Sequence, residues 1–274
     1  MIHSAEKHGE PGQGQERARL LVCRILFGFV VLFVWEFVTG RWVDAFWFSS
    51  PLRIFRMIEE WVQEGKIFGH LAVTLRETFL GYLLGSTLGV AVGLLFSRLK
   101  FMAKVMDPYI VAVNGIPRIA LAPLFIIWFG IGELSKVILA STVTFFLCFY
   151  GTLSGVRAVE PAYLNIARLM GANGSQTFVK VVLPAAAPWI VAAMKVSVPF
   201  SLVGAIVGEF MASTKGLGHL IQLSSAQFDT TGAVTGVLLL MVIVMVFNAA
   251  LDRLERYVLR WRPKDLSGAA REVH

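Results

Sequence analysis

The stretch NIARLMGANGSQTFVKVVLPAAAPW, residues 165–189, is a polar insert in the apolar second half of the chain. It holds two basic side chains, Arg168 and Lys180, two closely spaced glycines, Gly171 and Gly174, and several uncharged polar residues. Apolar runs of about 20 residues, long enough to cross a bilayer as helices, lie on both sides of it. We therefore interpret the insert as a connection between two membrane spans, with more helix-forming order than a plain loop requires.

The composition is that of an α-helical membrane protein. Of 274 residues, 56% are hydrophobic and only 16% are charged, with a mean hydropathy of +0.69, whereas about a quarter of a soluble domain is charged. A β-barrel is excluded because its strands are short and alternate in polarity. The net charge of +7 indicates basic loops on one membrane face, with no nucleic-acid partner. Cys23 and Cys148 form no metal or disulfide pattern and suit buried apolar sites.

The sequence predicts an all-α membrane protein with about six spans. They cover residues 21–38, 78–96, 109–131, 137–156, 186–211 and 233–251. A polar tail precedes them at residues 1–20, and a second follows at residues 255–274. The third span is the weakest, because Pro117, Arg118 and Pro123 interrupt it. These residues are tolerated only against other helices or a water-filled path.

The distribution of basic residues predicts the orientation of the spans. With the N-terminus inside, the inside segments hold 16 of the 25 Lys and Arg residues and the outside segments hold seven. Arg118 and Lys195 fall within spans. By the positive-inside rule, both termini and the insert between spans four and five lie in the cytoplasm.

The first external segment predicts a short helix on the outer surface. It reads SPLRIFRMIEEWVQEG, with Ser50 as a cap, Pro51 at the first helical position and Gly65 as a stop. Its apolar residues fall on one face, and these are Ile54, Ile58, Trp61 and Val62. Together with the first span it makes up residues 21–69.

In the second span, four glycines follow one another at intervals of four residues. They are Gly81, Gly85, Gly89 and Gly93. Such a face of small residues lets another helix backbone approach closely. It predicts helix packing and gives no information on a substrate.

The sequence contains no motif for binding ATP and neither of two common hydrolase motifs. It has no P-loop, no H-E-x-x-H and no G-x-S-x-G. Charges within the spans are sparse, namely Glu36, Arg118, Lys195 and Glu209. We expect Lys195 to extend towards the cytoplasmic face and Glu209 to reach water near the outer end. The chain therefore predicts a pathway whose energy source lies on another chain.

Within the insert, the pattern predicts two small helices at a glycine joint. The first begins at Glu160 and Pro161 and runs to Met170. Gly171 and Gly174 break it. The segment SQTFVKVVL then forms a second short helix, before Pro184 restarts the chain into span five.

The insert resembles the cytoplasmic "EAA" loop of type I ABC importer permeases. That pattern is E-A-A, three residues, Gly, nine residues, then I-x-L-P. Here it reads Asn165-Ile166-Ala167, three residues, Gly171, nine residues, then residues 181–184, V-V-L-P. The spacing agrees throughout. Asn165 replaces the usual Glu and Ile166 the usual Ala, which puts any salt bridge of that Glu in question.

The resemblance extends over residues 70–263. Two segments are similar to the second and third spans of the sulfonate, taurine and nitrate permease group. They are HLAVTLRETFLGYLLGSTLGVAVGLL and NGIPRIALAPLFIIWFGIGELSKV. GEFMASTKGLGHLI and LERYVLRWRP resemble that group after span five and at the C-terminus. The resemblance implies a type I ABC transmembrane domain at residues 70–254, in a bacterial inner (plasma) membrane.

The resemblance also implies partners and site residues. Two permease copies would form the pathway, two ATPase subunits would bind the coupling helices, and an external binding protein would deliver the substrate. ATP and Mg would bind the ATPase, so this chain would need no cofactor, metal or catalytic residue. The expected ATPase-coupling residues are Glu160, Asn165, Ala167, Arg168, Gly171, Ala172, Leu183 and Pro184. Pathway candidates are the polar residues within spans, namely Asn114, Arg118, Lys195 and Glu209.

Three functions stay open on the sequence. The first is the permease subunit of an ATP-driven importer, for an anion such as an aliphatic sulfonate, taurine or nitrate, or else for a vitamin or pyrimidine precursor. Arg118 and Lys195 favour the anion slightly. The second is a self-powered carrier or channel, and the third is a membrane enzyme, which would need a convergent catalytic set. The spacing of the insert favours the first.

Overall fold

The computed structural model describes residues 13–260, and this part of the chain is almost wholly helical. Its long helices are α1 (Gln13–Val38), α4 (Lys66–Arg98), α7 (Glu133–Arg157), α10 (Leu183–Ala212) and α12 (Thr230–Val258). The shorter ones are α2 (Ala45–Phe48), α3 (Pro51–Gln63), α5 (Lys100–Asn114), α6 (Ala122–Phe129), α8 (Pro161–Leu169), α9 (Gly174–Thr177) and α11 (Leu217–Ala226). A 3₁₀ turn, η1 (Arg118–Leu121), precedes α6, and a π turn, η2 (Phe178–Val182), precedes α10.

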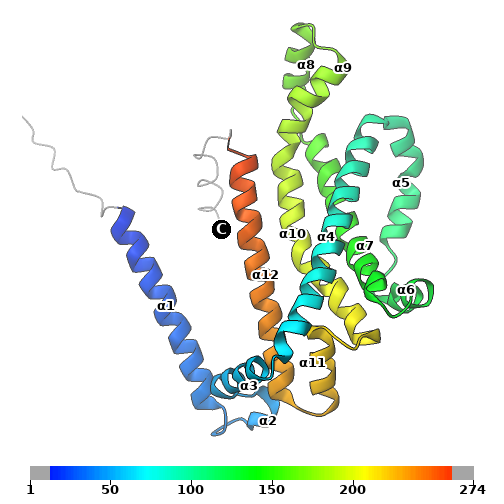
Figure 1. The fold of residues 1–274 in the computed structure, drawn as a ribbon. Coiled ribbons are helices and arrows are strands. Elements are labelled where there is room, and N and C mark those ends of the chain that lie inside the picture. The colour runs from blue at the N-terminus through cyan, green and yellow to red at the C-terminus, as the bar shows by residue number, and fades with distance from the viewer. Residues whose placement is uncertain (1–12, 261–274) are drawn as a thin grey trace, which may run out of the picture.

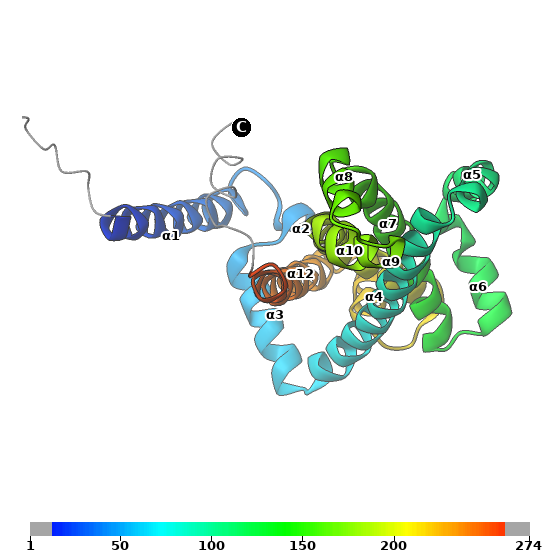
Figure 2. The same ribbon diagram turned by 90° about the horizontal axis from the view of Figure 1, so that it is seen from above.

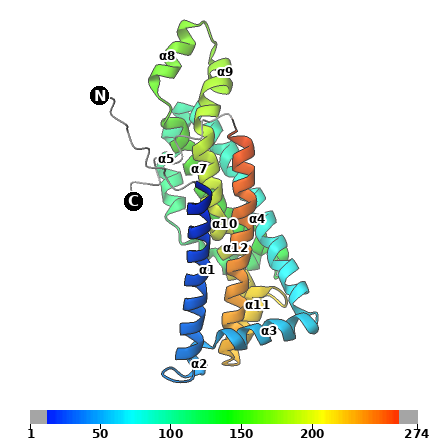
Figure 3. The ribbon, with the colours of Figure 1, turned by 90° about the vertical axis from the view of Figure 1, so that its left-hand side faces the viewer.

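The long helices form a bundle with two distinct ends (Figure 1). One end carries α8 and α9 and the last turns of α12, and we call it the insert end. The other carries α2, α3 and α11, and we call it the α3 end (Figure 3). Seen along the bundle, α1 stands apart from α4, α7 and α10 (Figure 2). The apolar residues of α1 are exposed all round, which suits a helix surrounded by lipid.

The number of spans agrees with the prediction, whereas their boundaries differ. Five helices of the described residues are long and apolar enough to cross a membrane, and a bent pair makes a sixth. The second span was predicted at residues 78–96, but α4 runs from Lys66 to Arg98. The prediction was too short because the charged pair Arg76 and Glu77 resembles the polar end of a span, whereas Glu77 is buried inside the bundle.

The third predicted span, residues 109–131, is two helices in the structure. The segments Phe101–Asn114 and Arg118–Phe129 are bent by 78° at the break between them. Pro117 lies in this break in an extended conformation and has no N–H to continue the helix. The interruption that the sequence predicts within the third span is therefore a sharp bend between two helical segments.

The fifth span begins within the insert, so the predicted restart at Pro184 was wrong. Residues Gly174–Ala212 form one helical segment of 39 residues through η2. Pro184 lies in the first turn of α10, directly after the wider π turn. A residue without an N–H is tolerated there because the pairing of the helix already changes at the π turn.

The predicted surface helix is α3, which begins at the Ser50 cap with Pro51 in its first turn. Ile54 and Trp61 are buried, and Trp61 packs in one cluster with Leu202 and Leu217. The prediction that Val62 shares this face was wrong, because its side chain is 43% exposed. Through this cluster α3 fixes the α3 end of α4, α10 and α11.

The centre of the bundle is the packing of α4 against α7, in which all four glycines of the α4 ladder take part. A Cβ built on Gly85 would lie 2.7 Å from the Thr144 Cβ and 3.0 Å from the Ser141 Cα. α10 packs beside α4 on an adjoining face of α7, where a Cβ on Gly204 would lie 2.7 Å from the Ala140 Cα. Because glycines of both helices meet the α7 backbone, and α4 and α10 also contact each other, the three helices form one closely packed unit.

A buried cluster of charged side chains joins the helices at the α3 end. Glu77 of α4, Lys136 of α7 and Glu209 of α10 are each at most 3% exposed. The Lys136 ammonium lies 3.9 Å from a Glu77 carboxylate oxygen and donates to the Ile131 and Gly132 carbonyls. Buried charges are tolerated only when they are paired and hydrogen-bonded, so this cluster depends on all three helices being in place.

Glu209 also positions the start of α11. Its carboxylate accepts hydrogen bonds from the Thr74 hydroxyl at 2.6 Å and from the Gly218 N–H, also at 2.6 Å. The Leu217 N–H in turn donates to the Thr74 oxygen at 2.8 Å. A carboxylate at the first turn of a helix is favourable. The expectation that Glu209 reaches water was wrong, because its exposure is 0%.

We predict opposite effects for two glycine-to-alanine substitutions in α4. Gly85→Ala should destabilise the protein by about 1–3 kcal/mol, because the added methyl group meets the α7 backbone. Gly69→Ala is the matched control, since nothing lies within 4 Å of its Cβ position. Alanine there should leave stability unchanged or raise it by up to about 1 kcal/mol. Thermal unfolding of the purified variants in detergent measures both effects, and equal effects would contradict the packing described.

We also predict that Glu209→Ala lowers stability strongly. It leaves the Thr74 hydroxyl and the Gly218 N–H without an acceptor, at about 1–3 kcal/mol for each buried donor. Glu133→Ala is the control, because Glu133 pairs with Arg76 at 3.3 Å on an exposed surface, where ion pairs contribute little. If both variants melt at the same temperature, Glu209 does not hold α11 in the way described.

Candidate functional site

The insert protrudes beyond the ends of the long helices. Figures 1 and 3 show α8 and α9 as a helical pair at the tip, joined to the bundle by α7 and α10. Leu169 and Met170 at the tip are 88% and 82% exposed. Large apolar side chains that are exposed together often mark a surface that binds a partner.

The first helix of the insert, α8, begins as the sequence predicts. Glu160 is its N-cap in an extended conformation, and Pro161 occupies the first turn. The Glu160 side chain makes no capping hydrogen bond and points to no partner within the described chain. Ala167 is buried at 7% exposure. Asn165, in place of the family's glutamate, accepts a 3.5 Å hydrogen bond from the Arg168 guanidinium on the exposed face.

Gly171 ends α8 in a Schellman motif. The Ala172 N–H donates to the Ala167 carbonyl at 3.0 Å, and the Gly171 N–H donates to the Arg168 carbonyl at 2.9 Å. Gly171 has a φ of +77°, a conformation that favours glycine over any other residue. The predicted glycine joint therefore has a definite geometry, which sets the direction in which the chain leaves α8.

The second helix of the insert begins with a capping box that our sequence interpretation missed. The Gln176 N–H donates to the Asn173 side chain at 2.8 Å, and the Asn173 N–H donates to the Gln176 side chain at 3.0 Å. The signal was present in the sequence, since Asn173 precedes Gln176 by three residues. The capping box and the Schellman motif together make the joint rigid.

The insert is fixed to the bundle at its base. The Arg98 guanidinium, in the last turn of α4, lies 3.9 Å from the centre of the Phe178 ring in η2. A cation over an aromatic ring is an attractive contact. Leu183 and Pro184 begin α10 directly after η2. The base of the insert therefore contacts α4 and continues into α10.

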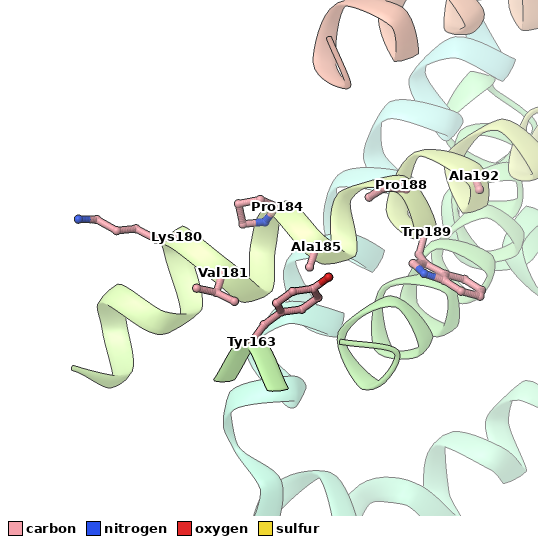
Figure 4. A pocket seen from close by; sticks show the side chains of 8 residues that line it. All are labelled: Tyr163, Lys180, Val181, Pro184, Ala185, Pro188, Trp189 and Ala192. Atoms are coloured by element: carbon pink, nitrogen blue, oxygen red, sulfur yellow. The ribbon is translucent and has the colours of Figure 1, made fainter. Parts of the chain in front are cut away.

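Two hollows flank Tyr163 between α8 and the start of α10. One, of about 650 Å³, is lined by Tyr163, Val181, Pro184 and Trp189 among others, and Figure 4 shows these side chains turned towards it. Lys180 extends away from the bundle in the same view. The other hollow, of about 580 Å³, includes Ala167, Gly171 and Ala172. The insert thus offers both a protruding tip and recesses, as a surface that receives a partner does.

The four pathway candidates lie in three different environments. Asn114 and Arg118 lie together at the break between α5 and η1, where the Arg118 guanidinium donates to the Asn114 side chain. Arg118 also lies 4.5 Å from the centre of the Phe146 ring. Helix breaks at membrane depth are tolerated where they line a cavity or face protein.

The other two candidates are engaged within the chain. Lys195 donates to Asp252 at 2.5 Å and to Glu255 at 2.7 Å, so it joins α10 to α12 near the insert end. Glu209 belongs to the buried cluster at the α3 end. The structure therefore separates Asn114 and Arg118 from Lys195 and Glu209.

Sequence reasoning missed the residues that complete this buried cluster. Thr74 and Glu77 were placed before the second span and Lys136 just before the fourth. A signal existed, because His70, Thr74 and Glu77 continue the face of Gly81 at helical intervals of three and four. No group of described residues could hold a metal ion.

Comparison with known proteins agrees with this geometry. The family of binding-protein-dependent transport system inner membrane components matches residues 81–262. The chain is 32% identical to the aliphatic sulfonates transport permease protein SsuC of Bacillus subtilis (strain 168), over 87% of each chain. It is 31% identical to the formylaminopyrimidine transport permease protein ThiX of Halalkalibacterium halodurans, over 87% of this chain and 95% of that one. The chain is 26% identical to the taurine transport system permease protein TauC of Escherichia coli (strain K12), over 83% of this chain and 84% of that one.

Solved structures share the fold. The MetNI methionine ABC transporter in an inward-facing conformation matches with a TM-score of 0.61 at 20% identity, over 69% of this chain and 94% of that chain. An amino acid ABC transporter matches with a TM-score of 0.58 at 18% identity, over 76% and 98%. The fold and the family match agree, and the chain belongs to the binding-protein-dependent transport system inner membrane components, the permeases of ABC importers.

Proposed function

We propose that this permease carries a small anion into the cell, driven by ATP that is hydrolysed on a separate ATPase chain. The observation that supports this most is the rigid, protruding insert with its exposed apolar tip. Two ATPase subunits would receive the insert of this chain and of a second permease copy, and an external binding protein would deliver the substrate. ATP and Mg would bind the ATPase and not this chain.

The proposed orientation places the insert end in the cytoplasm of a cell whose inner membrane the chain crosses. Basic residues are concentrated in the segments on that side. The last turns of α12 lie at the same end as the insert (Figure 1), which agrees with a cytoplasmic C-terminal tail. The predicted tails, 1–20 and 255–274, lie largely outside the described residues. The proposed transmembrane domain is residues 70–254.

The structure suggests how force on the insert reaches the outer end. The helical segment Gly174–Ala212 is continuous, and at 1.5 Å per residue it is about 58 Å long. Its far end carries Glu209, which holds the first turn of α11. A movement of the tip by the ATPase would therefore shift α10 as a unit and displace α11 at the opposite face. No ionisable group has to be transferred in this scheme.

The coupling surface that we propose includes both faces of the glycine joint. It consists of Glu160, Asn165, Ala167, Arg168, Gly171 and Ala172, with Leu183 and Pro184 at the base. The polar side chains of Glu160 and Asn165 are exposed, whereas Ala167 and Gly171 line a recess beside the tip. Asn165 has no charge, so this contact would depend on shape and apolar area.

The substrate that we propose is an aliphatic sulfonate, taurine, nitrate or a related anion. The Bacillus subtilis and Escherichia coli relatives are named for aliphatic sulfonates and taurine. Within the chain, Arg118 lies at a helix break inside a span, beside Asn114. Arginine suits the planar or tetrahedral oxygens of such anions, so both residues are proposed to line the pathway. A pyrimidine precursor is the second candidate because of the ThiX relative.

We predict that Gly171→Val uncouples the complex while the membrane domain stays folded. The substitution strains a residue with positive φ and redirects the tip, at a local cost of about 1–2 kcal/mol. In proteoliposomes with the ATPase and the loaded binding protein, stimulated ATP hydrolysis should fall at least about tenfold.

Gly174→Ala is the control for this experiment. Gly174 lies in the same insert, its Cβ position is open and its φ is not positive, so stimulated hydrolysis should stay within about twofold of the wild type. If Gly171→Val is harmless, or if transport proceeds without any ATPase, the insert is an ordinary loop and a self-powered carrier becomes the better account.

A ligand panel tests the substrate. Binding protein loaded with sulfonates, taurine, nitrate or a pyrimidine precursor should stimulate ATP hydrolysis only for the true substrate, and we expect an anion. Arg118→Gln should lower the transport rate of that anion about tenfold, since it removes a charged hydrogen-bond donor, without changing hydrolysis in the absence of the binding protein. Stimulation by the pyrimidine precursor alone would overturn the assignment of an anion.

A further inference from the structure

A further cavity lies at the base of the insert, apart from the two hollows beside Tyr163. It has a volume of about 640 Å³ and lies between the end of α4, the start of α5, the end of α7, α8 and η2. We call it the shoulder cavity. Its volume is within the range of about 300–1,000 Å³ that is usual for small-molecule sites.

The lining of the shoulder cavity is divided by polarity. Its apolar part comes from α4, α5, α7, α8 and η2 and includes Phe96, Leu153, Val156 and Phe178. Its polar part includes Ser97, Lys104, Asp107 and Arg157. An apolar wall beside a few convergent polar groups is the usual form of a site for an amphiphilic ligand.

The charges at the cavity favour an anion. Lys104 on α5 and Arg157 on α7 approach from two different helices, against the single carboxylate of Asp107. Among the described residues, neither cation forms an ion pair with a carboxylate. A third cation, Arg98, stacks on the outer lining ring of Phe178. Two unpaired cations at the mouth of an apolar cavity bind oxyanions favourably.

We propose that the shoulder cavity binds an anionic amphiphile. Its oxyanion head lies between Lys104 and Arg157, and its aliphatic chain lies along Phe96, Leu153 and Val156. Two sources share this chemistry, namely an imported aliphatic sulfonate reaching the cavity from the insert end, and an anionic phospholipid of the adjacent leaflet. The site is distinct from Asn114 and Arg118, which lie at the break after α5.

Occupancy of this cavity would affect the insert. The cavity is bounded by α8 and η2 on one side and by α4, α5 and α7 on the other. A ligand that fills it would hold these elements at one spacing and so restrain the movement of the tip. This regulatory consequence rests on the proposed function, whereas the binding itself does not.

The first test measures binding to the purified full-length chain in phosphatidylcholine nanodiscs. The probes are octanesulfonate and its cationic counterpart octyltrimethylammonium, titrated by calorimetry. Phosphatidylglycerol retention, measured by native mass spectrometry, tests the lipid as the source. We expect octanesulfonate or phosphatidylglycerol to bind at least tenfold more tightly than the cationic probe or phosphatidylcholine, respectively.

The variants test the location of the site. Lys104→Gln and Arg157→Gln should each weaken binding about tenfold, as expected for the loss of a charged hydrogen bond. Ala103→Leu, which adds apolar volume to the cavity lining, should abolish binding without removing a charge. Arg253→Gln is the control, because it removes a positive charge from the exposed surface of α12 at the same end and should change nothing.

Each outcome decides the proposal. Loss of octanesulfonate binding in the three cavity variants supports the site with a soluble anion, and loss of phosphatidylglycerol retention supports it with a lipid. Binding that is absent, that is equal for anion and cation, or that falls equally in Arg253→Gln overturns it. Because the readout is binding, a failure here is distinguishable from a failure of ATPase coupling. In the coupled complex, the bound ligand should lower stimulated ATP hydrolysis at least about threefold, an effect that Ala103→Leu removes.

Discussion

The close approach of α4 and α10 to α7 is the constraint on which the rest of the structure depends. Glycine on α4 and α10 faces the α7 backbone at Gly85 and Gly204. No side chain fits at these points, so the three helices cannot move past one another without losing the contacts of their whole length. The bundle is therefore one closely packed unit, and in the proposed function a movement of one end would be transmitted to the other.

The two ends of this unit have complementary roles. At the insert end, the Schellman motif at Gly171 and the capping box of Asn173 and Gln176 make a tip that keeps its shape. At the α3 end, the Glu209 carboxylate holds α11 to α10 through buried hydrogen bonds. In the proposed function, the tip, the continuous helical segment Gly174–Ala212 and this buried anchor would move together. The bend of 78° before Arg118 interrupts the segment Phe101–Phe129 and places Asn114 and Arg118 at the break.

Much of this could be predicted from the sequence, because lipid imposes a simple rule on the length of apolar helices. The six spans, the surface helix and the glycine joint follow from local patterns of this kind. The buried cluster does not, since Glu77, Lys136 and Glu209 are far apart in sequence and each alone resembles the polar end of a span. The continuity of α10 through Pro184 was also beyond local reasoning, because it depends on a π turn that no residue type specifies. Proline is favoured in the first turn of a helix, so local propensity predicts a helix start at Pro184. Whether another helical turn precedes the proline depends on the surrounding packing.

The central claim is that the tip of the insert contacts the ATPase, and site-specific cross-linking tests it most directly. In a chain with Cys23→Ser and Cys148→Ser, a cysteine is introduced as Leu169→Cys at the exposed tip. In a second chain it is introduced as Phe55→Cys on the exposed face of α3. Both are assembled with the ATPase and treated with a short bifunctional reagent, with and without ATP. The account predicts a cross-link to the ATPase from Leu169→Cys whose yield changes with ATP, and none from Phe55→Cys. A cross-link from α3, or none from the tip in an active complex, would contradict it.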